Sequence, residues 1–276
     1  MTHNQKYITL PSGEKISALC FGSWYLGEKT SCFSKEVNLV RDAVDAGCRV
    51  FDTAETYGNG GAQEVLGEAL QDCRKDVFLI AKALPENAVS YDSLTEACER
   101  ALERLKTDYL DMFLIHWCSD TLDLREAQEA FKDLYKQGLV RGYGIANADC
   151  DEMKEWIRVA SKENYGVCQT LFNLFHRTQN HKLLKICHKG KIPVMTYFPY
   201  EAGNYVYKNN VLKEIASELD ATPRQVALAW SFSHKNNAVI YKAAKKKDIC
   251  EAFDSMRLVL SERHKTLLDG IFPMLG

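Results

Sequence analysis

The sequence predicts an α/β protein: a (β/α)8 TIM barrel with an N-terminal β-hairpin cap. Short apolar segments alternate with helix-like segments from residue 18 to about residue 256. Eight apolar segments of this kind occur, and no linker or low-complexity tract interrupts them. Alternation builds a parallel sheet with helical crossovers, and eight uninterrupted units indicate a barrel.

The first strand-like segments predict the hairpin. Residues 7–10 and 15–16 flank a Pro11-Ser12-Gly13 turn, so we expect a small hairpin that caps one end of the core. The barrel strands that follow are short and apolar, and we predict them at residues 18–21, 49–51, 77–81, 109–115, 140–145, 167–171, 193–197 and 239–241.

Helical periodicity fills the intervals between these strands. Val37, Val40 and Val44 recur at helical spacing before Gly47. Apolar residues at positions 94, 98, 101, 102 and 105 do the same in the third predicted helix. Thr222-Pro223 opens a later helix, because a hydroxyl residue suits the cap and proline suits the first turn.

An open, doubly wound sheet with a glycine-rich dinucleotide loop is the competing architecture. Gly58-Asn59-Gly60 and Gly142-Tyr143-Gly144 are the two candidate loops. Neither has the third glycine of that fingerprint, and neither lies between a first strand and its helix. Both are therefore disfavoured as nucleotide loops.

Composition limits the partners. A chain of 276 residues with 46% hydrophobic content can bury a large core, and we expect one domain over residues 1–276. The net charge of -2, with both signs interspersed, favours a small-molecule partner over nucleic acid or membrane. Residues 1–10 are polar and no run approaches about 18 apolar residues, so we expect a soluble, cytoplasmic protein, as a monomer or weak oligomer.

Ten cysteines are present without any Cys-x-x-Cys pair, and we expect no signal peptide. We therefore expect reduced thiols, with Cys20, Cys98, Cys168 and Cys187 in the core because they lie inside apolar patterns.

Four polar residues lie at the ends of three successive predicted strands. Asp52 and Tyr57 follow the second strand, Lys82 the third and His116 the fourth. The carboxyl ends of barrel strands open onto one face, so these groups can meet at one substrate atom. Taken singly, each has a structural interpretation as a turn, loop, surface or core residue. Lys82 fits such an interpretation least, because it follows an apolar run expected to be buried.

The four residue types suit proton donation to a carbonyl oxygen. A phenol is a weak acid near neutral pH unless a cation favours its phenolate, and Lys82 can supply that cation to Tyr57. Asp52 can hold Lys82, and a neutral His116 can donate a hydrogen bond to the same oxygen. Hydride would come from a cofactor.

Several motifs resemble those of the aldo-keto reductases over nearly the whole chain. They are Phe21-Gly22-Ser23-Trp24, residues 51–58 (FDTAETYG), residues 67–70 (GEAL), Lys82, Leu114-Ile115-His116-Trp117, Gly144-Ile145-Ala146-Asn147, Gln169, Thr196-Tyr197-Phe198-Pro199 and Lys242.

The resemblance implies that Tyr57 is the general acid of a tetrad with Asp52, Lys82 and His116. It further implies that Asn147 and Gln169 bind the nicotinamide carboxamide. Tyr197 would stack on the nicotinamide ring, and Lys242 would meet the adenosine phosphate. The cofactor site implied by motif position also includes Ala146, Phe198, Pro199 and Ala243.

The chain departs from the family pattern at two positions. Ala146 stands where the family commonly has a serine, which removes one hydroxyl contact to the carboxamide. Asp248 stands where an arginine would clamp the phosphate, although Lys245, Lys246 and Lys247 lie beside it. NADP(H) is favoured as the cofactor, and NAD(H) is possible.

Trp24, Tyr25, Trp117 and Cys118 are predicted to line the substrate pocket. We expect that pocket to be open, because the chain ends at Gly276 soon after the last predicted helix. The pattern is most similar to short bacterial reductases that act on methylglyoxal and other small aldehydes. The predicted function is therefore NAD(P)H-dependent reduction of small aldehydes and ketones, without a metal.

Two other functions stay open at this point. One is a nucleotide-binding regulatory protein on the same barrel, which would bind cofactor with little turnover. The other is a metal-dependent barrel hydrolase using His116 and Asp52, which is disfavoured because no His-x-His follows the first strand.

Overall fold

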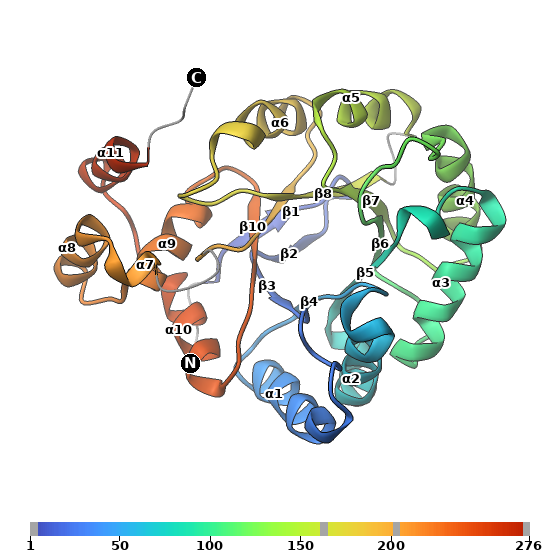
Figure 1. Ribbon diagram of the computed structural model, residues 1–276, viewed down its shortest axis with the longest axis horizontal. Helices are drawn as coiled ribbons and strands as arrows, with labels where there is room; N and C mark the ends of the chain where they lie inside the picture. The colour runs from blue at the N-terminus through green and yellow to red at the C-terminus, as the bar shows by residue number, and fades with distance from the viewer. Residues whose placement is uncertain (1–4, 161–164, 201–204, 273–276) are drawn as a thin grey trace.

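The computed structural model describes residues 5–160, 165–200 and 205–272, and within them eight parallel strands close into a barrel surrounded by helices (Figure 1). The predicted fold is confirmed. Around the barrel the strands run in the order β10-β3-β4-β5-β6-β7-β8-β9. Their bounds are β3 Leu19–Gly22, β4 Val50–Asp52, β5 Phe78–Ala83, β6 Met112–Ile115, β7 Tyr143–Ala146, β8 Tyr165–Leu171, β9 Val194–Tyr197 and β10 Asn237–Tyr241.

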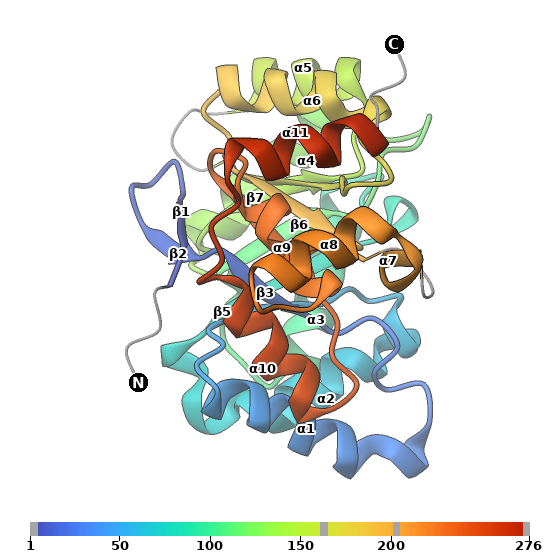
Figure 2. The same cartoon turned by 90° about the vertical axis from the view of Figure 1, so that its left-hand side faces the viewer.

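The N-terminal hairpin is also present. Strands β1 (Tyr7–Thr9) and β2 (Lys15–Ser17) pair antiparallel, with the Pro11-Ser12-Gly13 turn between them. The Asn236 side chain bonds to both the backbone N–H and the carbonyl of Thr9, just before β10 begins. The hairpin therefore covers the end of the barrel where the strands start, and Figure 2 shows it projecting there.

The helices lie outside the strands. They are α1 Phe33–Asp45, α2 Gly61–Leu70, α3 Tyr91–Leu105, α4 Leu124–Lys136, α5 Cys150–Val159, α6 Thr178–Lys189, α7 Tyr205–Lys208, α8 Asn210–Glu218, α9 Pro223–Phe232, α10 Lys246–Ser255 and α11 Glu262–Ile271. As predicted, Thr222 caps α9 by accepting a hydrogen bond from Gln225 N–H, with proline in the first turn. Among the described residues, no helix is long and apolar enough to cross a membrane.

Two strands begin three residues later than the sequence predicts, whereas the other barrel strands start within two residues of the prediction. β6 starts at Met112 and β7 at Tyr143, and before them only a single bridge joins Leu110 to Val140. Asp111 lies directly before β6, and its carboxylate is 2% exposed and accepts from Leu79 N–H at 2.8 Å. Arg74 and Arg141 pair with the same carboxylate, and Arg141 also reaches Glu14 in the hairpin. A charged side-chain network therefore lies at this end of the barrel, where the backbone of Leu110 still bonds to Leu139 and Arg141.

Candidate active site

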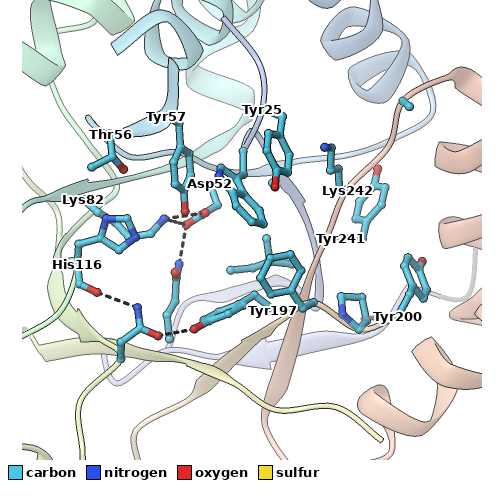
Figure 3. Close-up of a pocket in the computed structure, with 18 of the residues that line it drawn as sticks. Tyr25, Asp52, Thr56, Tyr57, Lys82, His116, Tyr197, Tyr200, Tyr241 and Lys242 are labelled. Carbon is cyan, nitrogen blue, oxygen red and sulfur yellow. Dashed lines mark hydrogen bonds and ion pairs between the residues drawn. The ribbon is translucent and has the colours of Figure 1, made fainter. Parts of the chain in front are cut away.

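The four predicted catalytic side chains meet at the carboxyl ends of the strands (Figure 3). Asp52 is the last residue of β4, Lys82 lies in β5, and His116 follows β6. Asp52 and Lys82 are only 3% and 2% exposed. The pleat of each strand turns these side chains into the barrel, and the end of the strand brings them to its open mouth.

The Lys82 ammonium group is fully hydrogen-bonded. Its Nζ donates to both Asp52 carboxylate oxygens at 2.7 Å and to the Thr53 carbonyl at 2.9 Å. Burial alone would lower the pKa of Lys82, but the charge of Asp52 and its hydrogen bond raise it above its usual value. Lys82 is therefore a fixed cation at neutral pH.

Tyr57 is held by a tight turn that follows β4. Gly58, Asn59 and Gly60 all have positive φ, at 57°, 52° and 92°. A side chain on Gly58 would place its Cβ 2.7 Å from the Leu26 carbonyl oxygen, so the loop after β3 leaves no room for one. The Gly58-Asn59-Gly60 segment thus shapes the chain between Tyr57 and α2.

Tyr57 lies against both Lys82 and His116. Lys82 Nζ is 5.2 Å from the centre of the tyrosine ring, and the His116 ring centre is 5.7 Å away in an edge-to-face arrangement. Lys82 favours the phenolate, as expected, but its effect is outweighed: the pKa of Tyr57 is raised from its usual value. Burial is the main cause and Asp52 adds to it, whereas Lys82 only opposes them. Because Lys82 is paired with Asp52, its field at the phenol is partly cancelled.

His116 is neutral, as the chemistry of the site requires. Burial and the nearby Lys82 charge lower its pKa to about 3. Its Nδ1 is buried without a hydrogen-bond partner among the described residues. A neutral imidazole can donate one hydrogen bond without placing a second positive charge beside Lys82.

This shift predicts a pH-dependent loss of stability. The folded pKa of His116 lies below the unfolded value of about 6.5, so its contribution is present above that value and declines as the pH falls toward 3. We expect the free energy of unfolding to drop by about 2 kcal/mol between pH 7 and pH 5 from this group. Urea unfolding of wild type and His116→Gln at both pH values measures it. Equal drops in the two proteins would contradict the assignment, since every other titrating group is shared.

The residues predicted to hold the carboxamide lie beside the tetrad and bond to it. Asn147, at a φ of 56°, donates from Nδ2 to the His116 carbonyl at 2.9 Å and accepts from the Tyr197 hydroxyl at 2.5 Å. Gln169 donates from Nε2 to Asp52 Oδ1 at 2.6 Å. Gln169 therefore also positions Asp52, a contact that the sequence did not predict.

A cavity of about 680 Å³ opens over the tetrad. Of the predicted pocket residues, Trp24, Tyr25 and Trp117 line it and are 37%, 45% and 39% exposed. Trp24 and Tyr25 stack with ring centres 4.1 Å apart. The cavity is open at these three rings, although Gly276, on which that expectation depended, lies outside the described residues.

Cys118 was predicted to line the pocket, and the structure does not place it in the cavity wall. Burial, together with the Glu152 carboxylate, raises the pKa of its thiol to about 12. Its side chain contacts α5 instead, because Glu152 belongs to that helix. An inert, protonated thiol follows.

The predicted cofactor residues divide into two groups. Tyr197, Phe198, Pro199 and Lys242 line the cavity together with Asn147 and Gln169. Ala146 and Ala243 are 0% and 2% exposed and do not line it, so neither side chain reaches a ligand there.

Tyr200 and Arg224 are among the lining residues that sequence reasoning missed. Arg224 lies in the first turn of α9, a position known from the Thr222-Pro223 start but without any motif that points to a ligand. Only the packing of α9 against the barrel mouth brings it to the cavity. Asp248, which also lines the cavity, pairs with Arg224.

The donors around the cavity fit a nicotinamide dinucleotide. Two amides and an aromatic ring, from Asn147, Gln169 and Tyr197, surround the tetrad. Lys242 and Arg224 supply cations elsewhere in the lining, as a phosphate-bearing ligand requires. Among the described residues, no group of three or more His, Cys, Asp or Glu side chains has metal-binding geometry.

Comparison with known proteins points to the same family that the sequence motifs resemble. The model of the aldo/keto reductase family matches residues 18–272. The chain is 36% identical over 273 residues to methylglyoxal reductase YeaE of Escherichia coli K12, covering 98% of this chain and 95% of YeaE. It is 30% identical over 240 residues to methylglyoxal reductase DkgB of Escherichia coli O157:H7, covering 85% of this chain and 87% of DkgB.

A solved structure is similar over the whole fold. An aldo-keto reductase from Klebsiella pneumoniae in complex with NADPH has a TM-score of 0.93 to this chain and 33% identity, covering 98% of this chain and 96% of its own. A match across the barrel, combined with the tetrad at its mouth, identifies this chain as a member of the aldo/keto reductase family and as an NAD(P)H-dependent oxidoreductase.

Proposed function

We propose that this enzyme reduces small aldehydes and ketones to alcohols with NADPH, and that 2-oxoaldehydes such as methylglyoxal are among its substrates. The observation that carries the proposal is the buried Asp52–Lys82 pair beside Tyr57 and His116, opening on one cavity. The names of YeaE and DkgB support the substrate class.

NADPH supplies a hydride to the carbonyl carbon when it is bound. Negative charge then develops on the carbonyl oxygen, and the Tyr57 hydroxyl is the group placed to donate a proton to it. Tyr57 is protonated at neutral pH, because a phenol pKa is ordinarily about 10 and burial raises this one further, so the proton is available. An alkoxide is a much stronger base than a phenolate, which makes the transfer favourable once that charge has formed.

The remaining tetrad residues stabilise this step. The phenolate left on Tyr57 lies beside the Lys82 cation, whose charge lowers its energy. Asp52 keeps Lys82 in place, and Gln169 restrains Asp52. Neutral His116 is assigned the second hydrogen bond to the substrate oxygen. Trp24 and Trp117 form an apolar wall that suits small, uncharged carbonyl compounds.

The roles of the cofactor residues stay as the motifs imply. Asn147 and Gln169 bind the carboxamide, Tyr197 stacks on the nicotinamide, and Lys242 meets the adenosine phosphate. Lys242 lines the cavity, and the Klebsiella pneumoniae relative was solved with NADPH, both of which favour NADPH over NADH.

We further propose that residues 1–276 act as one domain, as a monomer or weak oligomer in the cytoplasm, without nucleic acid as a partner. All ten cysteines are free, which suits a reducing compartment. No observation favours the regulatory alternative, since the four residues needed for turnover are all in place.

The proposal is tested by following cofactor oxidation with NADPH and NADH in parallel, against methylglyoxal and an aromatic aldehyde. We expect turnover of both aldehydes, faster with NADPH at limiting cofactor. Binding of NADPH without reduction of any member of a broad aldehyde panel would favour the regulatory alternative instead.

A further inference from the structure

The cavity lining contains two cations besides Lys82, namely Lys242 and Arg224. Lys242 follows β10 and was expected from the sequence, with its Nζ now 3.7 Å from the centre of the Tyr25 ring. Arg224 comes from a different element, the first turn of α9. The position that carries the family's arginine is Asp248, which also lines the cavity.

Arg224 is held at the cavity wall by contacts on several sides. Its guanidinium carbon lies 4.3 Å from the centre of the Tyr200 ring. Its Nη1 is 3.4 Å from Asp248 Oδ1 and 3.3 Å from Glu251 Oε2. The arginine side chain is 20% exposed, so the guanidinium is fixed in direction but still reaches the cavity.

These ion pairs leave the guanidinium able to bind a further anion. At 3.3 and 3.4 Å they are longer than the 2.7 Å between Lys82 and Asp52. Asp248 is shared with the Ala244 N–H at 3.0 Å, and Glu251 with the Thr222 hydroxyl. A guanidinium has five N–H donors and recognises phosphate through two of them held in a rigid, planar fork, which an ammonium lacks.

The lysine run beside Asp248 does not supply this cation. Lys246 pairs with Asp42 of α1 at 2.8 Å, and its side chain is 64% exposed. Lys245 and Lys247 do not line the cavity either. Among the cations that line the cavity, Arg224 is therefore the one that pairs with Asp248.

We propose that Arg224 recognises the 2′-phosphate of NADPH, together with Lys242. Arg224, in α9, then takes the role of the arginine that the family carries in α10 at the position of Asp248. Asp248 then orients the guanidinium rather than facing the phosphate unpaired. The proposal rests on the proposed function, because it assumes that the adenosine end of the cofactor lies at Lys242.

The test measures binding of cofactor fragments, without turnover. Calorimetry with the full-length protein compares 2′,5′-ADP, which carries the 2′-phosphate, with 5′-AMP, which lacks it. We expect Arg224→Met to weaken 2′,5′-ADP binding by about 10- to 100-fold, the range for losing a hydrogen-bonded charge, and to leave 5′-AMP binding unchanged. Lys246→Met is the matched control and should change neither.

Arg224→Lys covers the case in which the methionine variant does not fold. It keeps the charge but loses the planar fork, so the preference for 2′,5′-ADP over 5′-AMP should fall several-fold. The assignment is overturned if either folded variant keeps the wild-type preference for 2′,5′-ADP over 5′-AMP, or if it loses affinity for both ligands equally. Arg224 would then serve only to join α9 to α10. If the wild type binds neither 2′,5′-ADP nor NADPH, the proposed function fails with it.

Discussion

Replacing Tyr57 with phenylalanine is expected to lower kcat for carbonyl reduction by about 10²- to 10⁴-fold, the contribution of a positioned general acid. The substitution removes one hydroxyl and keeps the ring that packs on His116 and faces Lys82. NADPH affinity should therefore be nearly unchanged. Absorbance at the cofactor band gives kcat, and fluorescence titration gives the dissociation constant.

Tyr91→Phe is the matched control for this experiment. Its hydroxyl bonds to Asp133 at 3.4 Å, between α3 and α4, and it does not line the cavity. Activity close to that of the wild type is expected. A Tyr57→Phe enzyme that keeps more than a tenth of wild-type kcat would remove Tyr57 from the role of proton donor.

Replacing Lys82 with methionine is expected to reduce the free energy of unfolding by about 3–5 kcal/mol, because it leaves the buried Asp52 carboxylate without its counter-ion. It should also abolish reduction, since no cation then stabilises the Tyr57 phenolate. Urea unfolding monitored by tryptophan fluorescence measures the stability change, with NADPH absent so that ligand binding does not contribute.

The double variant Lys82→Met/Asp52→Asn separates charge from packing. Removing both charges should recover a substantial part of the lost stability, because an amide can still accept the hydrogen bond from Gln169. Reduction should stay abolished. If the single variant loses less than about 1 kcal/mol, the pair is not the buried, mutually dependent ion pair described here.

The barrel and the tetrad could be predicted because both depend on local sequence order. Each strand end places a polar residue after an apolar run, and parallel strands bring those ends to one face. The starts of β6 and β7 could not be predicted in the same way. Asp111 forms ion pairs with both Arg74 and Arg141, which come from other parts of the chain. Only these ion pairs offset the cost of burying a carboxylate in a strand-like run.

Interactions between distant elements explain the other differences. Lys82 acts on Tyr57 as the sequence predicted and lowers the pKa of the phenol, but burial, which the residue order does not reveal, raises that pKa more. Cys118 was placed in the pocket by motif position, whereas its thiol turns toward Glu152. Arg224 was missed because its distance to Asp248 depends on how α9 and α10 pack.

The hydrogen bonds of Asn147 have a consequence for how affinity is divided along the cofactor. In the free protein its amide already bonds to the Tyr197 hydroxyl and the His116 carbonyl, and Gln169 already bonds to Asp52. A carboxamide that engages these groups exchanges existing hydrogen bonds for new ones, so its net gain is small. Binding strength must then come mainly from the charged adenosine end, while the nicotinamide end serves alignment. Because the adenosine end is the same in NADPH and NADP+, the two forms then bind with similar affinity. The enzyme can therefore release NADP+ after each turnover and bind another NADPH.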